Sequence, residues 1–184
     1  MDGYIDANNA QVITATIIDW LSPASKSPAL DEYYLKMSPS YRAAHRPMIS
    51  ISELRLVKGI SPKLFLQLAP FVAALPTTTP INVNNAPPPV LMSLSMTMTL
   101  DAAKAIAAAC QRTPFPDATS FVNFDIVKNN PIDATKITVL SNYFLLETNV
   151  TLGKQTVKHY TLLERSMEGK QPKTSVLWQS KGTL

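Results

Sequence analysis

The residue pattern of this chain changes after residue 141, and this change restricts the possible fold more than any other feature of the sequence. Before it, apolar residues recur at helical spacing behind capping residues. After it, the segments "NYFLLETNVTL", "KQTVKHYTLLER" and "KTSVLWQS" are rich in Thr, Val, Tyr, Phe and Leu and are separated by turn-forming residues. The pattern predicts an α+β fold in which a helical part precedes three antiparallel strands.

The first helical part is predicted to form a helical hairpin behind a longer helix. Apolar residues at helical spacing behind an Asn cap predict an amphipathic helix over residues 9–21, and a short helix is predicted over 29–37. Ser50 and Glu53 have capping-box spacing ahead of "LRLV", and Gly59 is a candidate C-terminal cap. Two short helices joined around a glycine make a hairpin.

The stretch "INVNNAPPPVLMSL", residues 81–94, predicts a joint between two packed units. Asn82 and Asn84 are one residue apart, so both amides are expected on one side of an extended chain. The prolines at 87–89 fit the first turn of a helix, where missing N–H groups cost little. Asn85 is placed to cap that helix.

The helical pattern recurs after this joint. A helix over about 87–94 is followed by an Ala-rich helix that Thr99 or Asp101 can cap, and then by a third helix capped by Asp117. The recurring pattern therefore predicts that the helical part consists of two related units. The predicted divisions are residues 1–80 and 81–140 for the two helical subdomains and 141–184 for the strands.

Composition restricts function only weakly. Hydrophobic residues make up 46% of the chain and charged residues 16%, which indicates apolar surface that is buried against something else. The net charge of +4 admits an acidic partner, but the 17 Lys and Arg residues are scattered. The single cysteine, Cys110, lies on the apolar side of a predicted helix and is expected in the core. No stretch of the given sequence is predicted to span a membrane, and none is predicted to be a signal peptide.

Few residues suggest chemistry. Asp19, Asp31 and Glu32 could contribute oxygens to a calcium site, although calcium takes six to eight oxygen ligands, and helix capping or solvated surface is the competing interpretation. His45 and His159 are far apart in sequence, in a loop and a strand. Neither metal-ligand spacing nor a Ser–His–Asp arrangement is present, so the protein is not expected to be an enzyme or to hold a cofactor.

A nucleic-acid-binding protein is the alternative. The second helical unit resembles a helix-hairpin-helix DNA-binding unit, whose glycine-rich hairpin offers backbone N–H groups to a phosphate. Here the second hairpin reads "SMTMT" without glycine, and the first, "VKGIS", keeps only Gly59. The missing glycines and the lack of a clustered basic face argue against binding of nucleic acid.

The order of motifs along the chain supports a more specific interpretation. Taken together, "DWL", "YRAAHRP", "SELRLVKG", "INVNNA" and "YFLLETNVTLG" resemble the K-type minor pseudopilin of the Gram-negative type II secretion system, over roughly residues 9–180. The resemblance implies two SAM-like, helix-hairpin-helix-like subdomains inserted into a pilin-like antiparallel sheet.

The resemblance implies a structural subunit without catalytic activity. Such a subunit caps the tip of a periplasmic pseudopilus, helps to initiate its assembly with the I-type, J-type and H-type minor pseudopilins, and serves protein export across the outer membrane. Family members have an N-terminal hydrophobic helix that anchors them in the inner membrane, followed by a first pilin strand. Neither is present here, so the chain is expected to start inside the helical insertion.

The resemblance also bears on calcium. Members that bind calcium carry an acidic loop after the "DW" pair. Asp19 and Asp31 match that loop, but its other acids are replaced here by Ser22, Ala24 or Ser25, and Leu30. No bound metal is therefore expected.

The first predicted strand supplies a candidate partner-binding surface. Its alternation is expected to bring four apolar residues to one face of the sheet: Phe144, Leu146, Val150 and Leu152. In a pilin domain a long N-terminal helix lies across one face of the sheet. Because the chain lacks that helix, these side chains are expected to lack part of their cover and to take part in partner docking.

Overall fold

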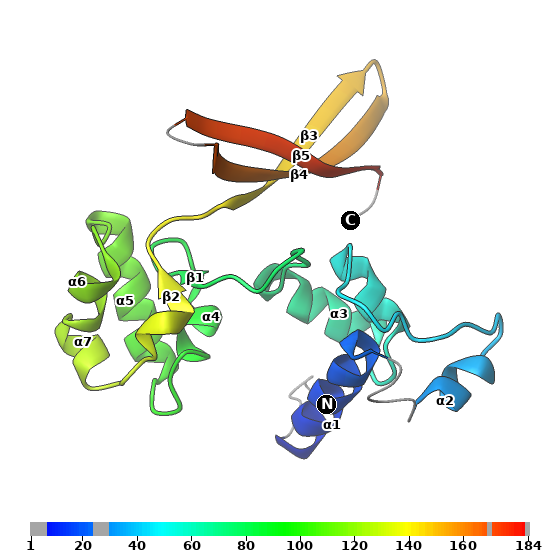
Figure 1. Cartoon of the computed structure of the whole chain (residues 1–184), viewed down its shortest axis with the longest axis horizontal. Coiled ribbons are helices and arrows are strands. Elements are labelled where there is room, and N and C mark those ends of the chain that lie inside the picture. Colours follow the sequence, from blue (N-terminus) through cyan, green and yellow to red (C-terminus); the bar gives the residue numbers. More distant parts are fainter. Residues whose placement is uncertain (1–6, 24–29, 169–170, 183–184) are drawn as a thin grey trace. The chain divides into compact units, whose positions relative to one another are not determined.

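The computed structural model describes residues 7–23, 30–168 and 171–182 of the 184-residue chain (Figure 1). The chain divides into two compact units, Met1–Thr77 and Thr78–Leu184. Each unit has helices around its own buried apolar cluster, and the C-terminal segment of the second unit forms a three-stranded antiparallel sheet. The α+β class predicted from the sequence is therefore confirmed.

The first unit consists of short helices around an aromatic cluster. The rings of Trp20 and Tyr34 meet edge to face with 5.3 Å between centroids, and Tyr41 lies 5.3 Å from Tyr34. Large buried aromatic side chains contribute much of the packing energy in a unit of this size. The elements are α1 (Ala7–Leu21), α2 (Asp31–Leu35), the 3-10 helix η1 (Ile51–Leu56), α3 (Pro62–Leu68) and the 3-10 helix η2 (Ala69–Phe71).

The bounds of the first two helices differ from the prediction. Helix α1 spans Ala7–Leu21, so the asparagines at positions 8 and 9 lie inside its first turn and neither is its N-cap. Helix α2 is five residues long and shorter than the predicted range 29–37, whose first residue lies outside the described residues. Both helices otherwise lie where the apolar spacing predicted them.

In the hairpin between η1 and α3, the predicted glycine is confirmed, whereas the hydrogen bonds differ from those of the predicted capping box. Gly59 has a φ of 88°, in the left-handed region that favours glycine. The Ser50 hydroxyl accepts a hydrogen bond from the N–H of Ser52 at 3.1 Å, and the Glu53 carboxylate accepts one from the N–H of Ile49 at 2.7 Å. Each bond is displaced by one residue from the predicted capping box because η1 is a tighter 3-10 helix.

The second unit begins with a compact helical part. The Thr99 hydroxyl caps α5, which settles the choice between Thr99 and Asp101, and Asp117 caps α6 as predicted. Among the described residues, no helix combines the length and apolar character needed to cross a membrane. The elements are β1 (Ile81–Asn82), α4 (Pro88–Met92), α5 (Leu100–Arg112), α6 (Ala118–Val122), α7 (Asp125–Lys128), the 3-10 helix η3 (Ala134–Lys136) and β2 (Ile137–Thr138).

The core of this part confirms the expectation for Cys110. Its thiol is buried and donates a hydrogen bond to the carbonyl of Val83 at 3.4 Å. Burial raises the pKa of the Cys110 thiol, which therefore stays protonated and unreactive. Val83, Leu91 and Phe121 beside it have no exposed surface.

The joint at the start of the second unit differs from the prediction. The chain does not stay extended, because β1 ends at Asn82 and the Asn82 side chain accepts a hydrogen bond from the N–H of Asn84 at 3.1 Å. Asn85 does not cap α4, whose N-cap is Pro87. β1 instead pairs in parallel with β2, and the Asn82 amide donates to the Ser141 hydroxyl at 2.9 Å. The two ends of the helical part are thus held together.

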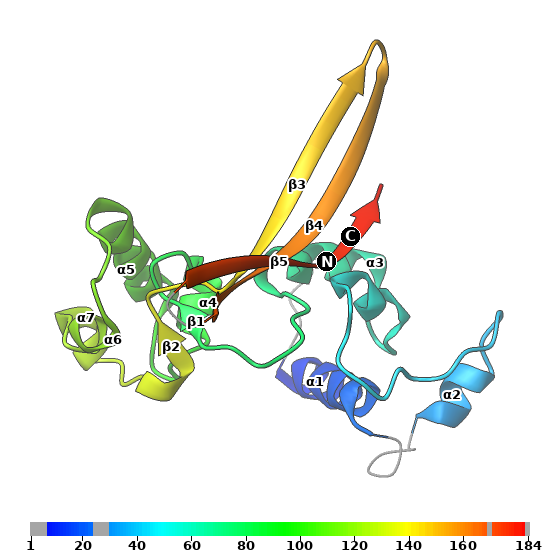
Figure 2. The ribbon, with the colours of Figure 1, turned by 45° about the horizontal axis from the view of Figure 1, so that its top comes forward.

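The three predicted strands are confirmed as an antiparallel sheet of order β3–β4–β5. Gly153, with a φ of 60°, lies in the tight turn between the first two strands. Figure 2 shows these two strands side by side as a long hairpin. The strands are β3 (Tyr143–Leu152), β4 (Gln155–Glu168) and β5 (Gln171–Lys181).

Candidate functional site

The strand register brings the four predicted partner-binding residues to one face of the sheet. Phe144 pairs with Leu163, Leu146 with Thr161 and Val150 with Val157. Residues directly opposite one another share a face, and alternate residues along a strand return to it. The exposed fractions of Phe144, Leu146, Val150 and Leu152 are 43%, 49%, 59% and 83%.

Two further exposed residues extend this surface. Val157 lies opposite Val150, and Val176 of β5 lies opposite Leu163, which itself pairs with Phe144. Sequence reasoning missed both, because the second strand alternates less clearly and the pairing of β5 depends on a register shift near Leu162. We define the apolar sheet face as Phe144, Leu146, Val150, Leu152, Val157 and Val176.

The opposite face of the sheet is more polar. Glu147 and Lys158 form an ion pair there at 3.0 Å. The hydrogen bond from Lys158 lowers the pKa of Glu147, and the same bond raises the pKa of Lys158. Both groups are therefore charged near neutral pH, but their solvent exposure limits what the pair contributes to stability.

The three calcium candidates do not form a common site. The Asp31 carboxylate binds the Nε2 atom of His45 at 3.1 Å and lies 4.0 Å from the Arg42 guanidinium, while Glu32 faces Lys36 at 3.8 Å. Asp19 is buried. In the described part of the chain, no three His, Cys, Asp or Glu side chains gather closely enough to hold a metal ion. Ala24 and Ser25, in the predicted loop, lie outside the described residues.

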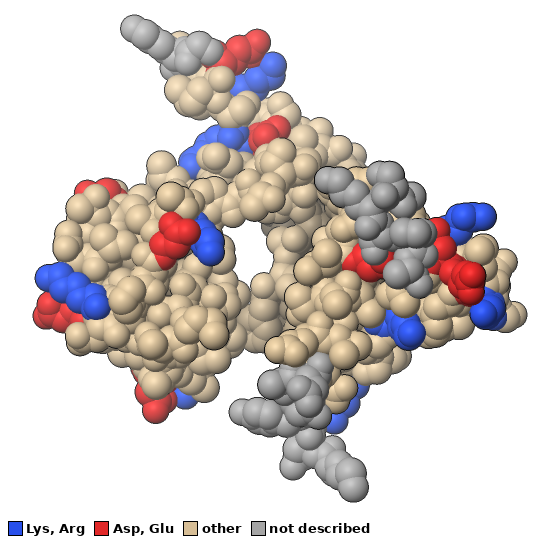
Figure 3. Space-filling model, turned by 60° about the horizontal axis from the view of Figure 1, so that its bottom comes forward, with Lys and Arg blue, Asp and Glu red and all other residues tan. Residues whose placement is uncertain are grey.

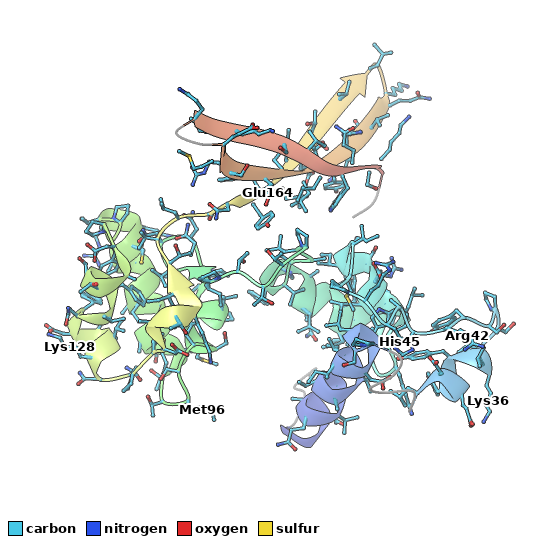
Figure 4. The ribbon with its side chains drawn as sticks, viewed as in Figure 1. Lys36, Arg42, His45, Met96, Lys128 and Glu164 are labelled. Carbon is cyan, nitrogen blue, oxygen red and sulfur yellow. The ribbon has the colours of Figure 1, made fainter. Side chains whose placement is uncertain are left out.

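Sequence reasoning missed the role of His45, because its partners are 14 and 23 residues away. Its backbone N–H donates to the Trp20 carbonyl at 2.9 Å, and its Nδ1 atom lies 2.8 Å from the Ser22 carbonyl. Figure 4 labels His45 and Arg42, which belong to the loop after α2. The hydrogen bond to Ser22 raises the pKa of His45, burial opposes this, and Asp31 and Asp19 raise it further.

Both ring nitrogens of His45 therefore face oxygen acceptors. A neutral imidazole carries one N–H and can donate to only one of them, whereas the imidazolium donates to both. The arrangement ties the end of α1 to the start of α2. We call these contacts of His45 with Ser22 and Asp31 the His45 brace, and its role is structural.

In the hairpin of the first unit, the backbone groups of Lys58 and the N–H of Ile60 are engaged within the unit. The N–H of Lys58 donates to the Tyr34 hydroxyl at 3.3 Å, and the Lys58 carbonyl accepts from the Thr16 hydroxyl at 3.1 Å. The Lys58 ammonium group lies over the Tyr33 ring, 4.5 Å from its centroid. These polar groups are engaged within the unit.

The hairpin of the second unit is equally unsuited to bind nucleic acid. The N–H groups of Thr97 and Met98 are bonded to Ser95 within the turn, and the Met96 side chain is fully exposed. On the face that Figure 3 draws, Lys and Arg lie in separate small groups, several of them beside Asp or Glu. The geometry gives the nucleic-acid alternative no support.

Comparison with known proteins identifies related sequences. Two family models, both described as type II secretion system (T2SS) protein K, match residues 3–77 and 81–140. The type II secretion system protein K of Pseudomonas aeruginosa is 33% identical over 160 residues, which are 84% of this chain and 47% of that protein. The protein of the same name from Klebsiella pneumoniae is 27% identical over 164 residues, covering 83% and 50%. The chain thus spans about half the length of the curated relatives it matches.

A solved structure shares the fold. A chain in the crystal structure of the GspK–GspI–GspJ complex from the type 2 secretion system of enterotoxigenic Escherichia coli superposes with a TM-score of 0.74. The match covers 98% of this chain and 66% of that chain, at 24% sequence identity. The helical units and the sheet therefore belong to one known architecture.

Proposed function

Because the chain belongs to the type II secretion system protein K family, we propose that it is part of a minor pseudopilin, a structural subunit of the secretion apparatus. The observation that carries this proposal is that both family models match in order along the chain. The fold shared with a chain from the GspK–GspI–GspJ complex supports it. The proposal assigns no catalytic step to the protein.

In this proposal the full-length protein caps the tip of a periplasmic pseudopilus and helps to initiate its assembly. Its partners are the I-type and J-type minor pseudopilins, with the H-type as a further neighbour, and its inner-membrane anchor is an N-terminal helix. Residues 1–80 and 81–140 act as two SAM-like helical subdomains, and 141–184 act as part of a pilin-like sheet. The separate family models over 3–77 and 81–140 support this division. The bulk of the helical subdomains blocks addition of another subunit above the tip.

The apolar sheet face is the proposed partner-binding surface. Fully burying a Val, Leu or Phe side chain contributes roughly 1.5 to 3 kcal/mol, and each member of this face is at least two-fifths exposed. Covering the face therefore offers a large favourable term for association. Exposed apolar residues gathered on one sheet face are typical of a protein interaction site.

Aspartate substitutions on the apolar sheet face test this proposal. Leu146→Asp and Val150→Asp in the full-length protein should each weaken co-purification with the I-type and J-type pseudopilins, because a carboxylate would be buried without a partner. Met96→Asp is the matched control, since it places the same charge at a fully exposed apolar position in the 93–99 turn. Thermal unfolding of each variant checks that the fold is retained.

The co-purification results distinguish an error in the pseudopilin assignment from an error in the assignment of the binding face. If the wild-type protein does not co-purify with these partners, the pseudopilin assignment is wrong. If binding survives both sheet substitutions and is lost with Met96→Asp, the assignment of the binding face is wrong.

A further inference from the structure

The segment "ETNVT", residues 147–151 of β3, has the form of an acceptor site for N-linked glycosylation. An asparagine followed two residues later by Ser or Thr is the motif that oligosaccharyltransferases modify. Bacterial enzymes of this class also recognise an acidic residue two positions before the asparagine, and Glu147 occupies that position. Among all asparagines of the sequence, Asn149 is the one that meets both conditions.

The strand places the three defining residues of this motif on one exposed face of the sheet. Glu147, Asn149 and Thr151 alternate along β3, so their side chains lie on the same face, and all three are exposed. Asn149 lies opposite Lys158, on the face that also carries the ion pair of Lys158 with Glu147. This face is opposite the apolar sheet face, so a glycan on Asn149 leaves the apolar sheet face open.

The hydrogen bonding of Asn149 stays within the motif. Asparagine is depleted in strands, so an asparagine inside β3 needs a reason. Asn84 has one, because its amide bonds the backbone of Phe115 and holds distant segments together. The Asn149 amide donates instead to the Glu147 carboxylate at 3.2 Å, two residues away on the same strand. This bond joins no separate segments, so the fold alone does not account for the asparagine.

The position of the motif in the sheet gives a transferase access to it. β3 is an edge strand, and Asn149 lies four residues before Gly153 in the hairpin turn. The Thr151 hydroxyl lies 2.9 Å from the Thr156 hydroxyl on the neighbouring strand. The end of a hairpin opens locally at a lower free-energy cost than the centre of a sheet. Opening of this end frees both the amide and the hydroxyl of the motif.

We propose that Asn149 is the acceptor of an N-linked glycan, which a periplasmic oligosaccharyltransferase transfers from a polyprenyl-diphosphate-linked oligosaccharide. The Nδ2 atom of Asn149 forms a bond to the anomeric carbon of the first sugar. The bond between that carbon and the diphosphate oxygen breaks, and its electron pair leaves with the diphosphate. One Nδ2 proton passes to a base of the transferase. Glu147 and Thr151 are positioning residues that hold the motif in the transferase by their carboxylate and hydroxyl.

Export of the full-length protein to the periplasm of a bacterial host tests the proposal. The host carries a bacterial oligosaccharyltransferase and its polyprenyl-diphosphate-linked oligosaccharide. Trypsin releases residues 137–154 as one peptide, which contains both Asn142 and Asn149, and fragmentation in the mass spectrometer distinguishes them. We expect the mass of the glycan on Asn149. An unmodified peptide, or a glycan on Asn142, would overturn the inference.

Variants of the motif separate recognition from folding. Asn149→Gln should abolish modification. Thr151→Val, which removes the hydroxyl at similar shape, should lower the modified fraction at least about tenfold, since a site built to bond a hydroxyl rejects an analogue without it. Glu147→Gln should also lower it, by about tenfold, because it removes a charge-assisted contact to the transferase. Thr151→Ser keeps the hydroxyl and should restore modification.

Thr156→Val is the matched control. It removes the hydroxyl that faces Thr151 across the hairpin but leaves the motif intact, so the modified fraction should not fall. Full modification of Thr151→Val, or an equal loss in Thr156→Val and Thr151→Val, would refute the inference. The proposal goes beyond the proposed function and shares only its periplasmic location. Co-purification with the pseudopilins is a separate measurement, so an unmodified protein that still binds them refutes this inference alone.

Discussion

Replacing Asn84 with alanine tests how the helical part of the second unit is held at its joint. The Asn84 amide donates to the Phe115 carbonyl at 2.9 Å and accepts from the Phe115 N–H at 2.9 Å. A typical intramolecular hydrogen bond contributes roughly 0.5 to 1.5 kcal/mol, so losing both should lower the free energy of unfolding by about 1 to 3 kcal/mol. The Phe115 ring also packs edge to face on Phe121, with 5.2 Å between centroids, so a loosened backbone would disturb the core.

Asn85→Ala is the control for this change. It removes the same side chain one residue along, at an exposed position, and should change the free energy of unfolding by less than about 0.5 kcal/mol. Urea denaturation measures both variants, and hydrogen exchange of the Phe115 amide reports the joint directly. The reasoning is refuted if the two variants are equally stable, or if the Phe115 amide in Asn84→Ala stays as protected as in the wild-type chain.

The remaining predictions concern the first unit. The pKa of His45 is raised above its ordinary value of 6.5, so the stability that its brace contributes should be fully present below about pH 6.5 and lost as the pH rises through the raised pKa. Melting curves of His45→Gln should therefore lack this loss and those of His159→Gln should keep it, and identical pH profiles for all three proteins would contradict the brace. Millimolar calcium should leave the melting temperature unchanged. A bound ligand at a hundredfold excess over its dissociation constant would stabilise the fold by about 2.7 kcal/mol, so a calcium site would be visible in this measurement. A rise of several degrees that a chelator reverses would show a calcium site.

Local signals in the sequence predicted individual elements well. The Ser50 hydroxyl and the Asp117 carboxylate cap the helices they precede, as predicted, and Thr99 is the one of two predicted candidates that caps α5, because a cap depends on residues only two or three positions away. The cap assigned to Asn85 was wrong, since that helix starts at Pro88 behind Pro87. With three consecutive prolines, spacing alone did not determine where the first turn begins.

The candidate surface was also partly predictable. The period of two in "YFLLETNVTL" was enough to place Phe144, Leu146, Val150 and Leu152 on one face, because successive side chains in a strand point to opposite sides. Val176 joins this face only through the register shift between β4 and β5. A shift of one residue moves every side chain of a strand to the other face, so that contribution required the paired strands.

The sequence by itself determined the α+β order, the caps formed by Ser50 and Asp117, the buried Cys110, the exposed face of β3 and the family, because each depends on residues near one another or on the order of motifs. The parallel pairing of β1 with β2 and the contact of His45 with Asp31 were decided only by tertiary structure. Short strands far apart in sequence carry no local periodicity, and a histidine in a polar loop carries no sign of its acceptors. Such contacts form only when packing elsewhere brings distant segments together, so no reading of neighbouring residues could have supplied them.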